Sequence, residues 1–521
     1  MDRRESGRRP FSVAGMPLEA VSFLGLTVII ALLYSHVHLL WADEFCSLYA
    51  DQLPSIGAVA HYQATTPMSL DPMVYNSLAH FAVKALGPIP LALRLPSLCG
   101  FVLMQVCVFY FVRRIAGVRA ATLALALPAL LGPSTYAVQG RPYATMLGLS
   151  ALAMLLWQKA SREEGRRPWT LVALAVSIAL AINTHFYGVL LLVPLCTAEL
   201  VRSFGRKRID APMVFAIIAG AMGIAFLLPF AKAAGRFSAH YYESGKLTYH
   251  FVTHTFLWLF LGYVTLSVRV QSLVALMLAV LVLGLVVGFV WTRSWRKIDL
   301  AWGEAALVVM MAALPVSGLL LAILVTHVVD GRYVIPALVG VVAGIAILAT
   351  PMMEHEASAR GLFVLLFVAT AVAGGFRIHN ERFQAKATLH FLELSPDVRA
   401  KLDAMPDQKI HFINPSTFFL ANYYMPYPEI RGRMQLMYWE DLDMEFTHSN
   451  YQTLSAIGLS QALPGKSVEF RSLIGHTGGE IFLVPYYASD WTQAALKRSH
   501  AVVTDLGPAF DGELVEAKFA P

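Results

Sequence analysis

The chain has 521 residues, of which 57% are hydrophobic and 14% charged, and its mean hydropathy is +0.58. Soluble domains carry about a quarter of their residues as charges, so this composition excludes an ordinary soluble enzyme and a disordered chain. The net charge of +6 is uneven: residues 378–521 hold 12 Lys and Arg against 17 Asp and Glu, which leaves 28 against 17 in residues 1–377. Because the basic residues stand between apolar runs, we expect no nucleic-acid partner.

Apolar runs long enough to cross a hydrocarbon layer of about 30 Å predict a polytopic α-helical membrane protein. About eleven spans are expected, near residues 17–40, 93–112, 119–136, 142–158, 169–184, 186–201, 211–231, 270–291, 301–325, 333–350 and 361–377. The stretch 251–268 is expected to be re-entrant or interfacial, because a twelfth span would place the basic cluster at Arg293 outside. The first span is not closed by a signal-peptidase site before Trp41, so it is expected to remain as an anchor.

Basic clusters in short loops orient the spans, because Lys and Arg favour the cytoplasmic side. With eleven spans every cluster falls on that side; they begin at Arg3, Arg113, Lys159, Arg202 and Arg293. The N-terminus is then cytoplasmic and the C-terminal tail extracytoplasmic, in an integral protein of the inner or plasma membrane. We therefore expect a membrane domain at 1–377, whose first outer loop is 41–91, and a small extracytoplasmic α/β domain at 378–521.

The tail shows mixed periodicity. It predicts helices at 396–405, 418–424 and 451–463 and strands at 409–414, 467–473 and 480–486. It has no P-loop and no glycine fingerprint for a nucleotide.

Asp43 and Glu44 follow the first span directly. At the negative end of a helix dipole and beside each other, both carboxylates are expected to gain proton affinity, which suits a general base. Alternatively, Asp43 caps an interfacial helix at 44–53. Asp71, followed by Pro72, carries the same ambiguity, because Asp and Pro are common at helix starts.

Further polar residues stand in the other outer loops. Arg141 lies in a very short loop, where it either reaches lipid headgroups or holds a lipid phosphate. His185 is either a satisfied interfacial histidine or a ligand to substrate or metal. Arg332 either pairs with Asp330 or faces the substrate. Arg236 belongs to a basic loop, 232–246, which is either solvated or binds an anionic headgroup.

The order of these motifs is more specific than any one of them. An Asp-Glu pair after the first span is followed by Leu93-Arg94-Leu95-Pro96-Ser97, Arg141-Pro142-Tyr143, Thr184-His185-Phe186-Tyr187 and Gly331-Arg332-Tyr333. Over about residues 17–350 this resembles the GT-C glycosyltransferases. Within them it resembles the branch of protein-O-mannosyltransferases, lipid A aminoarabinose transferases and Rgt-type galacturonosyltransferases.

This resemblance implies an inverting glycosyltransferase that moves a sugar from a polyprenyl-phosphate donor to a lipid, glycan or protein acceptor on the outer face of the membrane. Asp43 would be the general base and Glu44 would orient the base or the acceptor. Arg141 and Arg236 would contact the donor phosphate, Arg236 by loop position only. Asp71, Tyr143, His185 and Arg332 complete the expected substrate-binding set.

The chain departs from that family in two places. Many members have an acid two residues before the arginine of Arg-Pro-Tyr, where this chain has Gln139, and Met73 replaces the second proline of a Pro-Pro pair. The missing carboxylate argues against a metal-dependent mechanism, so we expect neither a metal nor another cofactor. The alternative is a transporter or flippase of a lipid-linked or small anionic substrate, but such proteins tend to place ionisable groups near the midplane.

Overall fold

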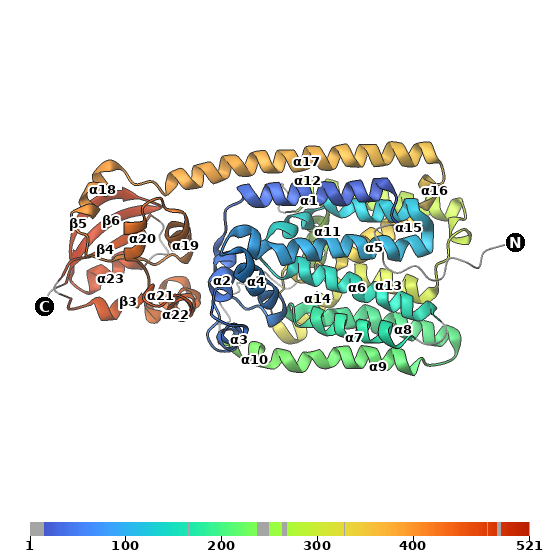
Figure 1. Cartoon of the computed structure of the whole chain (residues 1–521), viewed down its shortest axis with the longest axis horizontal. Helices are drawn as coiled ribbons and strands as arrows, with labels where there is room; N and C mark the ends of the chain where they lie inside the picture. The colour runs from blue at the N-terminus through green and yellow to red at the C-terminus, as the bar shows by residue number, and fades with distance from the viewer. Residues whose placement is uncertain are drawn as a thin grey trace.

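The computed structural model describes residues 15–163, 167–236, 250–262, 268–327, 329–476, 478–486 and 491–519. A bundle of long helices is followed by a smaller α/β domain (Figure 1). The helices of the bundle are α1 (Leu18–Val37), α2 (Ala42–Asp51), α3 (Ile56–Thr65), α4 (Met73–Leu86), α5 (Pro90–Ala126), α6 (Tyr143–Arg162), α7 (Pro168–Ile182), α8 (Leu192–Arg206), α9 (Ala211–Ala221), α10 (Leu228–Ala234), α11 (His250–Leu261), α12 (Val268–Trp291), α13 (Trp302–Ala312), α14 (Leu314–Leu321), α15 (Ala337–Leu348), α16 (Thr350–Met353) and α17 (Glu356–Phe391).

The bundle belongs to an integral membrane protein. Among the described residues six helices are long and apolar enough to cross a membrane, or seven if α13 and α14, bent by 56°, form one span. The predicted number of eleven is therefore not confirmed. The apolar helices α7, α11 and α15 have 10–17 residues each, and α5 carries two predicted runs that are divided at Gly117, where φ is +84°.

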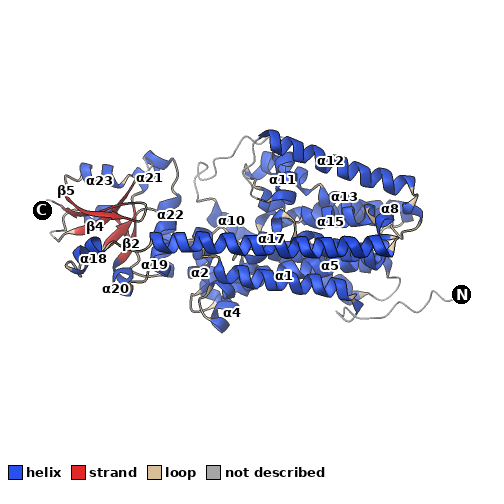
Figure 2. Ribbon diagram, turned by 90° about the horizontal axis from the view of Figure 1, so that it is seen from above, coloured by secondary structure: helices blue, strands red, loops and turns tan. Residues whose placement is uncertain are grey.

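The helices of the first predicted outer loop lie at the same end of the bundle as the tail. In Figure 1 α2, α3 and α4 stand at the end of the bundle that faces the α/β domain, and Figure 2 shows the same for α2 and α4. Helix α11 is only 12 residues long, and its side chain Trp258 is buried against the rest of the bundle. Helix α15, in a predicted span, is equally short, so length alone does not separate a re-entrant segment from a span, and the re-entrant character of 251–268 stays a prediction.

The tail is joined to the bundle by α17, which continues through the predicted boundary at 377 as far as Phe391. The tail contains α18 (Pro396–Asp403), β1 (Ile410–Phe412), α19 (Pro415–Tyr424), α20 (Pro428–Arg433), β2 (Met434–Tyr438), α21 (Glu440–Thr447), α22 (Tyr451–Ala462), β3 (Ser467–Glu469), β4 (Glu480–Pro485), α23 (Thr492–Arg498), β5 (Val502–Ala509) and β6 (Gly512–Lys518).

The strands form a six-stranded sheet in the order β3-β2-β1-β4-β6-β5. The first four run parallel, whereas β6 is antiparallel to both β4 and β5. The predicted α/β character is confirmed. The predicted strand at 467–473 ends at Glu469 and continues as a short 3-10 turn, and β2, β5 and β6 were not anticipated.

Helix α19 attaches the tail to the first loop. The rings of Phe45 and Tyr49 on α2 contact Phe419 at centroid distances of 5.8 and 5.6 Å. The Tyr424 hydroxyl accepts a hydrogen bond from the Leu40 N–H at 2.9 Å, immediately before α2. The tail therefore packs on the helix that begins with the predicted acidic pair.

Candidate active site

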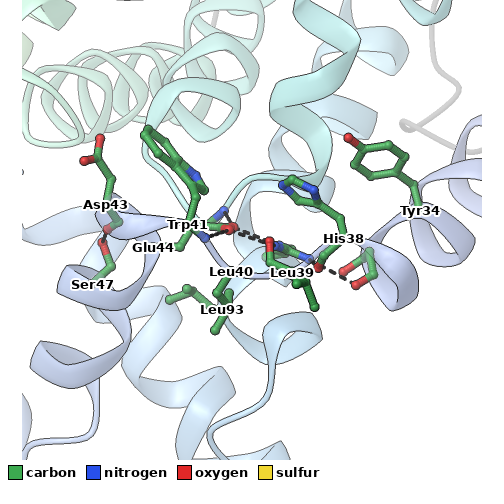
Figure 3. A network of polar contacts seen from close by, with 12 residues as sticks. Tyr34, His38, Leu39, Leu40, Trp41, Asp43, Glu44, Ser47 and Leu93 are labelled. Atoms are coloured by element: carbon green, nitrogen blue, oxygen red, sulfur yellow. Dashed lines mark hydrogen bonds and ion pairs between the residues drawn. The ribbon is translucent and has the colours of Figure 1, made fainter. Parts of the chain in front are cut away.

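The acidic pair lies in the first turn of α2, and its two side chains point to different sides (Figure 3). Glu44 accepts a hydrogen bond from the Trp41 N–H at 3.3 Å, so Glu44 and not Asp43 satisfies the start of the helix. The capping alternative for Asp43 is therefore wrong. The expected position at a negative helix end is also wrong, because Asp43 stands in the first turn of α2, at the positive end of that helix dipole.

Glu44 is completely buried and bound to Arg94 of α5. Arg94 donates from Nε to Oε1 at 2.8 Å and from Nη2 to Oε2 at 2.7 Å. Burial alone would raise the pKa of Glu44, but the Arg94 guanidinium outweighs it and holds that pKa below its usual value. The remaining guanidinium N–H groups bind backbone carbonyls at the end of α1, namely those of Ser35, His38 and Leu39.

The loop that carries Arg141 is fixed to the same carboxylate. The Gly140 N–H donates to Glu44 Oε1 at 2.6 Å. The Ser97 hydroxyl on α5 donates to the Arg141 carbonyl at 2.8 Å. Glu44 thus links the start of α2, helix α5 and the loop before α6. This link brings the segment that carries Asp43 next to the loop that carries Arg141.

Gly140→Ala is expected to disturb this junction. A Cβ at position 140 would lie 2.5 Å from Leu93 Cδ2 and 3.2 Å from Glu44 Oε1. Such overpacking typically costs about 1–3 kcal/mol. The melting temperature of the purified variant should fall and its activity should drop, whereas Gly361→Ala on α17, where a Cβ meets nothing within 4 Å, should change neither. Equal melting temperatures for the two variants would contradict this packing.

Arg141 is buried in a polar cluster with Asp71 and Ser69. Its Nη1 lies 3.0 Å from Asp71 Oδ2 and 3.0 Å from Ser69 Oγ, and the Ser69 hydroxyl donates to Asp71 at 2.5 Å. Asp71 is 3% exposed and does not cap α4, which begins after Pro72. The helix-cap alternative for Asp71 and the headgroup alternative for Arg141 are therefore both wrong.

The Asp43 carboxylate faces two guanidinium groups without a close hydrogen bond to either, and Arg141 Nη1 donates to the Asp43 backbone carbonyl at 3.4 Å. Asp43 Oδ2 lies 3.8 Å from Arg141 Nη2 and 4.0 Å from Arg332 Nη1. Its side chain is 28% exposed and that of Arg332 is 25% exposed. Arg332 also lies 3.7 Å from Asp330, as the sequence allowed, so it pairs with Asp330 and faces Asp43 at once. A reachable carboxylate between two cations is the central feature of the site.

An aromatic group lies beneath the two arginines. The guanidinium carbons of Arg141 and Arg332 are 5.9 and 5.6 Å from the centroid of the Tyr143 ring. His185 contacts Tyr143 and Tyr333 at centroid distances of 5.4 and 4.9 Å. Its Nδ1 accepts the Tyr187 N–H at 3.2 Å. Burial, together with the two guanidiniums, lowers the pKa of His185 to about 3, so this imidazole is neutral near pH 7.

Arg236 is not part of this cluster. It lies exposed just after α10, where it donates a hydrogen bond to the Thr65 carbonyl. The prediction that its side chain joins Arg141 is therefore not supported by its position. The rest of the predicted basic loop, from 237 to 246, lies outside the described residues.

Comparisons with known proteins find one family match and several similar folds. Residues 71–231 match the dolichyl-phosphate-mannose-protein mannosyltransferase family. The fold is similar to the crystal structure of ArnT from Cupriavidus metallidurans bound to undecaprenyl phosphate, with a TM-score of 0.58, 13% identity, and coverage of 95% of this chain and 97% of that one. The apo state of ArnT gives a TM-score of 0.57 with the same identity and coverage.

The family match covers residues 71–231, less than half of the chain, and the two ArnT structures are 13% identical to it, so what the chain shares with ArnT is the fold. An oligosaccharyltransferase from Archaeoglobus fulgidus is similar at a lower level, with a TM-score of 0.42, 13% identity, and coverage of 83% of this chain and 61% of that one. No curated protein matches.

Sequence reasoning did not assign a role to several residues of this candidate site. Arg94 was noted only as part of a motif, although a lone arginine inside an apolar run is itself a signal of function or buried pairing. Ser69 and Tyr333 carry no comparable signal, because their roles depend on contacts with distant residues. Within the described part of the chain, no three His, Cys, Asp or Glu side chains gather to hold a metal ion.

Proposed function

We propose that this protein is an inverting glycosyltransferase that moves a sugar from a polyprenyl-phosphate donor to an acceptor on the outer face of the cell membrane. The observation that carries the proposal is the Asp43 carboxylate, reachable and held between Arg141 and Arg332. A transferase of this kind needs a base for the acceptor and cations for the leaving phosphate, and this site offers both within about 4 Å.

In the proposed reaction Asp43 accepts the proton of the acceptor hydroxyl. The acceptor oxygen attacks the anomeric carbon while the bond from that carbon to the phosphate oxygen breaks, and the electron pair leaves with the polyprenyl phosphate. General base catalysis typically contributes about 10² to 10⁴ in rate. Cations placed where negative charge develops often contribute more. No covalent enzyme intermediate and no metal ion take part in this proposal.

The two carboxylates near Arg141 have different roles in the proposal. Asp71 is buried and bound to Arg141 and Ser69, so it balances the arginine and cannot reach an acceptor. The Asp43 carboxylate comes no closer than 3.8 Å to Arg141 and is partly exposed. Glu44 is a positioning residue, because Arg94 and Gly140 occupy its oxygens. Of the two roles expected for Glu44, orientation of the base or of the acceptor, the proposal keeps orientation of the base.

The two arginines also differ. Nη1 of Arg141 is engaged at 3.0 Å with both Asp71 and Ser69, whereas the ionic contacts of Arg332 measure 3.7 and 4.0 Å. A guanidinium with loosely engaged donors can turn its planar fork to a phosphate. We therefore assign the main phosphate contact to Arg332, with Tyr143 and His185 forming the surface beneath the donor headgroup.

Similarity to ArnT, whose structure contains undecaprenyl phosphate, supports a polyprenyl phosphate as the donor lipid. The acceptor is a lipid, glycan or protein that approaches from the side of α2 and the tail. Deletion of the gene, followed by mass spectrometry of envelope lipids and glycans, tests the activity. The deletion should remove one sugar from one acceptor class, and expression of the wild-type chain should restore it. Unchanged envelope lipids and glycans would contradict the proposal.

Arg332→Gln is expected to weaken binding of undecaprenyl phosphate by about 10- to 100-fold, because a hydrogen bond to a charged group is worth about 1.5–3 kcal/mol. Affinity would be measured by titration of the full-length protein in detergent. Arg296→Gln is the matched control, since Arg296 also lies over an aromatic ring, that of Trp295, but outside the site. Equal affinities for the two variants would remove Arg332 from the donor site.

A further inference from the structure

A separate pocket lies between α1, α17 and the segment that follows α5. Its empty volume is about 490 Å³, part of which is open to the surroundings. Its lining includes Thr27, Tyr34, Ser134, Val138, Thr370 and Arg377. Asp43, Arg141 and Arg332 do not line it, so it is distinct from the candidate active site.

Arg377 stands in this pocket with spare hydrogen-bond donors. It is half-buried and donates from Nη1 to Ser134 Oγ at 2.5 Å. The nearby carboxylate of Glu381, one turn further along α17, is occupied by His38 at 2.6 Å and by the Tyr34 hydroxyl at 3.0 Å. Among the described residues no carboxylate forms an ion pair with Arg377. A guanidinium has five N–H donors, so most of those of Arg377 are available to an anion.

The interior of the pocket is apolar. The hydroxyl groups of Thr27 and Thr370 donate to carbonyls of their own helices, those of Phe23 and Leu366, at 2.9 and 2.8 Å. Seven residues separate Thr370 from Arg377, which corresponds to a depth of about 10 Å along α17. The pocket therefore has one cationic end, on the side of the tail, and an apolar length that follows two membrane-spanning helices.

The outer faces of those helices are exposed and apolar. Ile29 and Leu33 on α1, and Val368 and Val372 on α17, are 51–66% exposed. Gly374 packs directly on Ile30, because a Cβ there would lie 2.5 Å from the Ile30 side chain. The seam, meaning the contact line between α1 and α17, is thus closed where Gly374 meets Ile30, and the pocket lies beside this contact. This part of the protein faces lipid.

We propose that this pocket binds an anionic glycerophospholipid, with its phosphate on Arg377 and Ser134 and one acyl chain lying between α1 and α17. Charge complementarity selects the anionic headgroup. A linear acyl chain suits the narrow seam better than a polyprenyl chain, which bears a methyl branch on each isoprene unit. The bound lipid fills the seam at the helix that leads to the tail. This proposal does not depend on the proposed function.

The test is native mass spectrometry of the full-length protein with added dioleoyl-phosphatidylglycerol, dioleoyl-phosphatidylcholine or undecaprenyl phosphate. The wild type should retain phosphatidylglycerol at least about tenfold better than phosphatidylcholine, and Arg377→Gln should abolish this preference. Arg382→Gln is the matched control, because Arg382 is exposed on the same helix and does not line the pocket, and it should keep the preference.

A second variant keeps the cation and fills the space. Ala31→Phe should also abolish phosphatidylglycerol retention, because Ala31 lines the apolar length of the pocket. If Ala31→Phe retained phosphatidylglycerol like the wild type, the lipid would bind by its headgroup alone, and the assignment of the acyl chain to this pocket would be wrong. If Arg377→Gln lost undecaprenyl phosphate but not phosphatidylglycerol, the assignment of a glycerophospholipid as the occupant would be wrong. Neither result bears on sugar transfer, whose test uses the donor and Asp43.

Discussion

Asp43→Asn is expected to lower the rate of sugar transfer by about 10² to 10⁴-fold, the usual contribution of a general base. Asparagine has the same shape as aspartate but cannot take the acceptor proton. The fold should be unaffected, because the nearest ionic contacts of Asp43 are 3.8 and 4.0 Å long. Donor affinity should be equal or higher, since the change removes a negative charge from beside the phosphate site.

The measurement is single-turnover transfer by the purified variant with donor and acceptor, together with donor binding by titration. Asp330→Asn provides the matched control, because it also removes a carboxylate beside Arg332 but not the one between the two guanidiniums. It should reduce transfer by less than about tenfold. Turnover of Asp43→Asn within about fivefold of the wild type would exclude Asp43 as the base.

Arg94→Met is expected to destabilise the folded protein by about 3–5 kcal/mol, because it leaves the fully buried Glu44 carboxylate without its partner. The same change frees three carbonyls at the end of α1, so the start of α2 should also lose its position and transfer should fall with stability. The measurement is thermal and denaturant unfolding of the purified protein, with tryptophan fluorescence as the signal.

The double variant Arg94→Met with Glu44→Gln separates two causes of the lost stability, namely the loss of the arginine and the unpaired buried charge of Glu44. It should recover a large part of the lost stability, because replacement of both members of a buried pair is often nearly neutral. Arg360→Met is the control, since its pair with Glu356 is exposed and should contribute less than about 1 kcal/mol. A loss for Arg94→Met as small as that for Arg360→Met would contradict the structural role of the buried pair.

The class of protein could be predicted because hydropathy is a local property. Each apolar run, such as 17–40 or 361–377, is read from its own residues, and the runs predicted to span the membrane are largely helical in the structure. The number of spans could not be predicted as well. Whether a run crosses, bends or breaks depends on neighbouring helices, as at Gly117 and at the 56° bend between α13 and α14.

Most residues of the site could also be predicted from the sequence, because Asp43, Arg141, His185 and Arg332 follow or precede predicted helices at one end of the bundle. The residues that pair with them could not be predicted. Arg141 meets Asp71 and Ser69, some 70 residues away, and Glu44 meets Arg94, 50 residues away. Arg236 was assigned to the site by its loop alone, and its side chain binds a carbonyl elsewhere.

By itself, the sequence determined that this chain crosses a membrane, which polar residues stand at the helix ends and which superfamily their order resembles. Only the tertiary structure decided that Asp43 is the reachable carboxylate, whereas Asp71 and Glu44 are buried in ion pairs. The physical reason is that helix propensity and hydropathy act over a few turns. The pairing of one carboxylate with one guanidinium depends on a few ångströms between helices that the chain brings together only on folding.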